Sequence, residues 1–202
     1  MGLKMLRGCI PCVAFIVLVA ASTAGFAAPY ELAPKKSEVG FEASYLALSK
    51  TYGVFENFSV DARIDDEDLS KTSVEVRIVT KSLKTDSEAR DGVLRSGDYF
   101  NVDEHPEMTF RSVEMVQKSG TWKLLGKLTM LGVTKPVTMD VTVSPLHESV
   151  DGRLYRDVAV SGIVTRSDFG MGGNIFIGDD VVVSIGLTLF KLDSETTSTT
   201  AP

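Results

Sequence analysis

Residues 83–112 read LKTDSEARDGVLRSGDYFNVDEHPEMTFRS. This stretch decides the fold, because it contains the one helical pattern that we find in a chain otherwise made of strand patterns. Thr85 and Glu88 have the spacing of a capping box, in which each side chain satisfies a free backbone N–H at the start of a helix. We therefore expect a short helix over Ser87–Arg95. The loop after it should end at Pro106, since proline cannot donate a hydrogen bond to a strand ladder.

Apolar and polar residues alternate on both sides of this stretch, with the period of two that is typical of half-buried strands. The apolar positions before it are Val39, Phe41, Ala43, Tyr45 and Ala47, then Val54, Phe58, Val60, Ala62 and Ile64, then Val74, Val76 and Ile78. The apolar positions after it are Met108 and Phe110, then Val137, Met139, Val141 and Val143, then Val181, Val183, Ile185, Leu187 and Leu189.

Turn and bulge signals separate these strands. The alternation slips between Phe110 and Val113, which predicts a β-bulge, and Ser119–Gly120 and Asp151–Gly152 predict hairpin turns. The result is about eight antiparallel strands, with too few helices to cover both faces of a parallel sheet. Strands of about ten residues suit the tilted strands of a barrel better than those of a sandwich. We therefore predict an all-β fold, a closed antiparallel barrel with a short helix at one end.

The two ends of the chain differ from this pattern. Residues 1–27 carry Lys4 and Arg7, an apolar run over Cys9–Ala21 and then small residues, which is the layout of a secretory signal peptide cleaved after Ala27. The alternative is an uncleaved anchor, but a run of about 13 residues is shorter than the ~20 needed to span a bilayer. We expect the barrel domain over 28–192 and a disordered tail over 193–202, DSETTSTTAP.

Composition argues against several functional classes. Without the signal segment, 19 basic and 27 acidic residues leave a net charge of −8, which disfavours nucleic acid and anionic lipid surfaces as partners. Both cysteines lie in the signal segment, so we expect no disulfide or thiolate chemistry. His105 and His147 lack a second ligand at metal-binding spacing, and no nucleophile motif is present. We predict no metal site, no catalytic residues and no cofactor.

The barrel interior is the remaining candidate for a site. An eight-stranded barrel is either filled by its side chains or holds one small ligand. The predicted inward residues include large rings as well as small residues such as Ala43, Gly126 and Gly162. The residues alone leave a filled core and an apolar tunnel equally open.

Two polar clusters contain arginines. Arg90 and Arg95 lie in the helical stretch with Asp91 and Asp98, and Arg166 begins the run RSDFG. The planar guanidinium suits a carboxylate or a phosphate group. In one alternative each arginine pairs with a nearby aspartate and holds a loop at the rim of the barrel. In the other it contacts the polar head of a ligand.

Three segments resemble motifs of the YceI-like family. Residues 90–112 resemble its RD-x-x-L-x-S-x-D-(F/Y)-F segment, which a proline and a T-F-x-S follow. Residues 124–139, LLGKLTMLGVTKPVTM, resemble its G-x-L-T-x-x-G-V-T-x-x-V segment, and RSDFGM at 166–171 matches its late motif. The resemblance spans about Tyr30–Leu192. It implies an extended eight-stranded lipocalin-like barrel whose tunnel takes a polyisoprenoid or another long lipid, with no established catalytic activity. Relatives often have a histidine in the first long strand, where this chain has Tyr45.

We therefore expect an exported lipid-binding protein that carries or stores a long isoprenoid or other lipid, in the periplasm or outside the cell. We expect no nucleic-acid partner and no stable membrane span, and a homodimer stays open. Strand phase predicts that the lining residues are Phe41, Ala43, Tyr45, Phe58, Val60, Val76, Phe110, Leu128, Met139, Val141, Val183 and Ile185. The rim candidates for a polar head are Arg90, Arg95 and Arg166. The alternatives are a lipid-modifying or isomerising enzyme and a ligand-free structural or partner-binding barrel.

Overall fold

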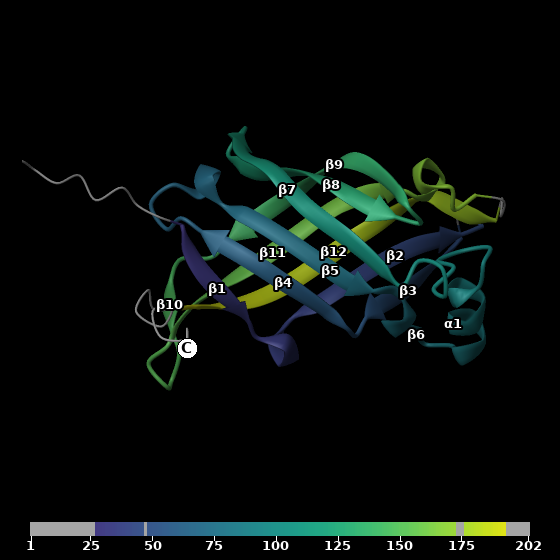
Figure 1. The fold of residues 1–202 in the computed structure, drawn as a ribbon, viewed down its shortest axis with the longest axis horizontal. Helices are drawn as coiled ribbons and strands as arrows, with labels where there is room; N and C mark the ends of the chain where they lie inside the picture. The colour runs from purple at the N-terminus through teal and green to yellow at the C-terminus, as the bar shows by residue number, and fades with distance from the viewer. Residues whose placement is uncertain (1–26, 47, 173–175, 193–202) are drawn as a thin grey trace, which may run out of the picture.

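The computed structural model describes residues 27–46, 48–172 and 176–192. The predicted signal peptide, apart from Ala27, and the predicted tail lie outside these described residues, as does Ala47 of the first predicted strand. Figure 1 shows an elongated barrel of tilted strands, with α1 beside one end and β10 at the other.

Twelve strands in the described ranges belong to one sheet. They are β1 (Ala28–Leu32), β2 (Glu38–Tyr45), β3 (Ser49–Phe55), β4 (Phe58–Ile64), β5 (Ser73–Val79), β6 (Leu83–Thr85), β7 (Glu107–Lys118), β8 (Thr121–Met130), β9 (Val133–Val143), β10 (His147–Glu148), β11 (Leu154–Thr165) and β12 (Ile177–Lys191). The helical elements are η1 (Pro34–Lys36), η2 (Leu69–Lys71), η3 (Thr80–Ser82), α1 (Glu88–Arg95) and η4 (Arg166–Phe169).

Eight of the strands close into a ring, in the spatial order β11-β9-β8-β7-β5-β4-β1-β12, and β12 pairs back with β11. Every ladder around the ring is antiparallel. The predicted eight-stranded antiparallel barrel with a short helix at one end is therefore confirmed. Closure removes the unpaired edges that an open sheet of this length would expose.

The long strand β12 supports both ends of the barrel. Its last residues pair with β1, from Leu189 to Lys191, while its earlier part pairs with β2, from Ile177 to Gly186. β3 and β6 continue the sheet outward from β2. The barrel is consequently extended at the α1 end, where β2 and β3 lie beyond β1 (Figure 1).

The predicted irregularities are confirmed where the structure describes them. The β7–β8 register shifts between Ser112 and Glu114, which is the expected bulge and leaves Val113 exposed. Ser119 and Gly120 both have positive φ, 51° and 82°, as a two-residue hairpin turn requires. One prediction is wrong: Val54 and Phe58 belong to separate strands, because the chain turns between β3 and β4 and Phe55 takes the inward position.

Helix α1 (Glu88–Arg95) lies where the sequence predicts it, with its start displaced by one residue, but its cap differs from the expectation. Its N-cap is Ser87, whose hydroxyl accepts from the Arg90 N–H, so the predicted capping box of Thr85 with Glu88 is wrong. Thr85 instead binds Asp91, whose Oδ1 accepts from the Thr85 backbone N–H over 2.8 Å and from its hydroxyl over 2.7 Å. Asp91 is only 4 % exposed. This carboxylate therefore fastens α1 to β6, and with it to the end of the barrel.

Candidate functional site

A cavity of about 570 Å³ lies inside the barrel. Its wall is formed by inward residues of the ring strands, with contributions from β2, β3 and α1. Arg90 and Arg166 are the charged residues among its lining residues in the described part of the chain. The interior is therefore a hollow with an apolar wall, and both charged groups lie toward the α1 end.

The cavity runs along the barrel. Inward residues of β12 line it from Ile177 at the α1 end to Leu189 near the opposite end. At a rise of about 3.3 Å per residue and a strand tilt of roughly 40°, this stretch corresponds to an axial length of about 30 Å. A modest volume over such a length describes a narrow tunnel, which fits an extended chain better than a compact molecule.

Glycines in the wall explain why large side chains leave this hollow unfilled. The Phe110 ring lies over Gly126 of the neighbouring strand, where an added Cβ would come within 2.3 Å of the ring. Phe41 lies over its ladder partner Gly53 in the same way, at 2.4 Å from such a Cβ. The rings therefore lie along the wall, where the missing side chains leave room, instead of crossing the barrel.

The predicted lining residues lie on the cavity wall with one exception. The residues on the wall are Phe41, Ala43, Tyr45, Val60, Val76, Phe110, Leu128, Met139, Val141, Val183 and Ile185. Phe58 is not on the wall: it is the first residue of β4, opposite Ile78, and is half-buried against the core. The alternation places Phe58 on the inward face of β4. It does not reach the cavity wall because it lies at the start of the strand, directly after the turn from β3.

The wall also contains residues that were not among the predicted lining residues. Ala89, Val93 and Leu94 of α1 face the cavity, together with Phe100 from the loop after the helix. Their spacing of three to four residues is a signal of an inward helix face. The sequence could not show that this face lies at the barrel opening. The alternation within strands gives the inward side chains of each strand, but not the position of a helix relative to the strand ends.

The α1 end is the open end of the cavity. Tyr45 is 44 % exposed and Val93 is 54 % exposed, although both line the cavity. At the opposite end the lining residues Ile64 and Leu189 are buried, and Leu69 of η2 packs against the core below them. We call the opening between β2 and α1 the mouth.

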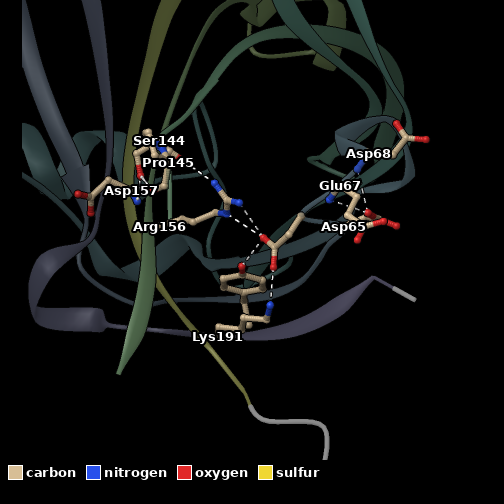
Figure 2. Close-up of polar contacts among 10 residues, drawn as sticks. Asp65, Glu67, Asp68, Ser144, Pro145, Arg156, Asp157 and Lys191 are labelled. Atoms are coloured by element: carbon tan, nitrogen blue, oxygen red, sulfur yellow. Dashed lines mark hydrogen bonds and ion pairs between the residues drawn. The ribbon is translucent and has the colours of Figure 1, made fainter. Parts of the chain in front are cut away.

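A polar cluster around Asp66 covers the end opposite the mouth. Asp66 Oδ1 accepts from the Tyr30 hydroxyl over 2.8 Å and from Arg156 Nε over 2.9 Å, while Oδ2 accepts from Lys191 Nζ over 2.6 Å. Figure 2 shows Arg156 and Lys191 converging on this carboxylate. The four residues come from β1, β11, β12 and the loop after β4. The cluster therefore joins segments that are far apart in the sequence.

The cluster shifts the pKa values of its acids. Burial, and next the hydrogen bond to Asp66, raise the pKa of Tyr30 to about 12. Burial alone would raise the pKa of Asp66, but the hydrogen bonds from Lys191, Tyr30 and Arg156 outweigh it and hold this pKa below its ordinary value. Both shifts favour the ionisation states that the hydrogen bonds need, an ionised Asp66 and a protonated Tyr30.

The three arginines proposed for the rim have different roles. Arg90 lines the mouth and pairs with Asp86 over 2.5 Å. Arg95 does not line the cavity; it donates to the Leu83 carbonyl and lies 3.9 Å from Asp91. Arg95 therefore supports the loop-holding alternative, while Arg90 combines an ion pair with a place at the mouth.

Arg166 is buried and holds the connection between β11 and β12. Its guanidinium donates to the carbonyls of Gly178, Met171 and Ile177, over 3.1, 2.6 and 3.0 Å. These contacts hold the chain beside the α1 end of the cavity, which Arg166 also lines, and again favour the loop-holding alternative. No group of three or more metal-binding side chains occurs among the described residues, and no helix there is long and apolar enough to cross a bilayer.

The family model of the YceI-like domain matches residues 30–189, which include all or most of every strand of the ring. The chain belongs to the YceI-like family. A curated YceI-like relative, a UPF0312 protein of Staphylococcus aureus, is 31% identical over 153 residues, covering 72% of this chain and 87% of the relative.

Solved YceI-like structures share the barrel. The Campylobacter jejuni YceI protein matches with a TM-score of 0.63 at 25% identity, covering 70% of this chain and 85% of that chain. BcnA of Burkholderia cenocepacia matches with a TM-score of 0.70 at 22% identity, covering 78% and 99%. A structure described as a polyisoprenoid binding domain from Saccharophagus degradans matches with a TM-score of 0.62 at 16% identity, covering 82% and 99%. The last two similarities show the fold alone.

Proposed function

We propose that this YceI-like protein binds one long apolar chain, a polyisoprenoid or similar lipid, inside its barrel for carriage or storage. The observation that carries the proposal is the tunnel, about 570 Å³ in volume, whose wall is mostly apolar and has its charged groups, Arg90 and Arg166, only toward the mouth. The description of the Saccharophagus degradans neighbour as a polyisoprenoid binding domain supports the same ligand class.

The energetics of the tunnel suit such a ligand. Each CH₂ group moved from water into an apolar site contributes about 0.8 kcal/mol, so a long chain binds tightly without specific polar contacts. The chain end lies toward Leu189 and the polar head lies at the mouth, near Arg90, because the opposite end is closed. The protein should then select lipids by the width of their apolar chain, and bind chains of similar width with similar affinity.

The alternative functions receive less support. A ligand-free barrel would have a filled interior, and the cavity argues against it. The described lining residues include no His, Cys, Asp, Glu or Lys, so hydroxyl groups such as those of Ser44 and Tyr45 and the two arginines are the polar side-chain groups available to a ligand. We therefore favour a binding protein over a lipid-modifying or isomerising enzyme.

The proposed place of action is the periplasm or the outside of the cell. The support is the layout of residues 1–27, with Lys4 and Arg7 before a short apolar run and small residues before Ala28. Intact-mass measurement of the protein from the exported fraction tests this. A mass that begins at Ala28 supports export with cleavage, and a mass that retains Met1 contradicts it.

The test of ligand binding is mass spectrometry of an organic extract from the gently purified protein. We expect one long-chain lipid for each barrel, and its absence from Ala43→Trp, whose indole would occupy the tunnel near the mouth. Ala159→Trp is the matched control, because Ala159 is exposed on the outer face of β11. Equal lipid in all three proteins would place the ligand outside the tunnel and overturn the proposal.

A further inference from the structure

The tip of the β2–β3 hairpin forms an apolar surface beside the mouth. Tyr45, Leu46 and Leu48 form this tip, and Phe176 lies against it, since the Leu46 N–H donates to the Phe176 carbonyl over 2.7 Å. Leu48 is 90% exposed, and the other three are between 44% and 50% exposed. We call these four residues the mouth tip. Clustered exposed apolar side chains of this kind mark interaction sites more often than singly exposed ones.

The backbone at the tip does not explain the choice of leucine. Leu46 has a φ of 52°, in the left-handed region that favours glycine or asparagine and disfavours bulky side chains. The hairpins at the closed end turn through Ser119–Gly120 and Asp151–Gly152, which are ordinary turn residues. Leu131, in the turn between β8 and β9, has the same backbone conformation with a φ of 53°, but its side chain packs against the core. The side chain of Leu46 is instead half-exposed, so burial in the core does not account for a leucine at this position.

The mouth tip is continuous with the tunnel. Tyr45 pairs with Ile177 across the β2–β12 ladder, and both line the cavity. Val93 of α1 lines the mouth from the other side and is also half-exposed. An apolar chain that enters or leaves the tunnel therefore passes along the mouth tip.

Charges beside the mouth tip are paired. Lys50 binds Glu42 over 2.6 Å on the β2–β3 ladder, and Arg90 binds Asp86 over 2.5 Å on α1. The described residues beside the tip thus present ion pairs, not a basic surface. A partner of this surface would be recognised by apolar contact, with little attraction for anions.

We propose that the mouth tip docks on a lipid bilayer and inserts its side chains, so that an apolar chain moves between bilayer and tunnel without crossing water. This inference rests on the proposed function, because the tunnel supplies the reason for such contact. Aromatic side chains are enriched at the bilayer interface, and binding there strengthens with the apolar area that is buried. Exposure of each CH₂ group to water costs about 0.8 kcal/mol, so a route that keeps the chain covered should be faster than release into solution.

The test is flotation with phosphatidylcholine vesicles, which carry no net charge. Leu46→Asn and Leu48→Asn remove apolar area from the mouth tip, and asparagine suits the backbone at position 46. Val150→Asn is the matched control, because Val150 is fully exposed in the hairpin at the closed end. All proteins keep the same amino terminus, verified by intact mass, so residues 1–27 contribute equally wherever they are retained.

We expect the parent and Val150→Asn to bind the vesicles equally in low and high salt. Each tip variant should bind at least roughly tenfold more weakly, as the lost burial of one leucine side chain predicts. Parent protein that does not bind the vesicles, or tip variants that bind like the parent, would overturn docking. Lipid in the organic extract together with a failure to bind vesicles would refute docking alone. Vesicle binding with no extracted lipid would instead refute the proposed function.

Discussion

The Phe110 ring occupies the space that a side chain at Gly126 would need, across the β7–β8 ladder. The same arrangement joins Met139 to Gly162 across β9 and β11, where an added Cβ would come within 2.2 Å of the Met139 sulfur. These two pairs keep bulky side chains against the wall. The hollow interior is thus a property of particular pairs of residues and not of the barrel in general.

Gly126→Ala should destabilise the protein more than Gly162→Ala. The new methyl at 126 would meet the Phe110 ring and also lie 2.7 Å from the Arg111 carbonyl oxygen, which is backbone and cannot swing away. The methyl at 162 would mainly meet the end of a flexible methionine side chain. We expect a loss of about 1–3 kcal/mol for Gly126→Ala and less for Gly162→Ala, measured by urea unfolding of delipidated protein. Equal losses would contradict this account.

Gly162→Ala should reduce lipid occupancy although it spares stability. The displaced Met139 side chain has the tunnel as its free space, since Met139 already lines the cavity. The extract from this variant should contain less lipid than the extract from the parent. The double variant Gly162→Ala/Met139→Ala should regain the lipid content of the parent, because the alanine at position 139 does not extend into the tunnel. Full occupancy in the single variant would show that Met139 moves elsewhere.

Stability should fall between about pH 10 and 12 through Tyr30. Its pKa is 10.0 ordinarily and about 12 in the folded protein, so below pH 10 both folded and unfolded states keep the proton and the contribution is complete. As the pH rises through this window, the unfolded state loses the proton first, and the free energy of unfolding decreases. Tyr30→Phe should flatten this decrease, measured as the urea midpoint against pH. An unchanged slope in the variant would assign the alkaline loss to other groups.

A prenyl alcohol should bind more tightly than the matching prenyl diphosphate. Arg90 is already paired with Asp86, and Arg166 donates to three backbone carbonyls, so neither offers an uncommitted charge to a diphosphate at the mouth. Displacement of a fluorescent fatty-acid probe measures the two affinities. Asp86→Asn, which releases Arg90, should raise the affinity for the diphosphate and leave that for the alcohol unchanged. A parent protein that prefers the diphosphate would refute the expectation.

The N-cap of α1 provides a test of the corrected helix start. Ser87→Ala should lower the free energy of unfolding by about 1 kcal/mol, because the cap hydroxyl satisfies the Arg90 N–H. Glu88→Ala should cost only a few tenths of that, through the helix dipole. A larger loss for Glu88→Ala than for Ser87→Ala would reinstate the capping box with Thr85.

The sequence was sufficient for the barrel because its strands alternate regularly. Val181, Val183 and Ile185 follow the period of two and all face the cavity, and the slip after Phe110 marks the bulge that the structure contains. The prediction was less successful at strand ends. Val54 and Phe58 are an even number of residues apart, so the alternation predicts one strand for both, although a turn separates them.

The site was only partly predictable for a different reason. Alternation shows which side chains face inward, but not whether they meet in the middle. That depends on Phe110 lying over Gly126 and on Phe41 lying over Gly53, which are contacts between strands. The share of α1 in the wall depends on how Asp91 fastens the helix to β6, and no local pattern in the sequence describes this.

Because the Asp66 cluster covers one end of the barrel, the cavity has a single opening. A second molecule cannot push the first one out from behind, so exchange must proceed by departure and then arrival. The last part of a ligand to go in is also the first to come out. If the protein binds a lipid as proposed, the lipid enters and leaves in one orientation, with its polar head at the mouth.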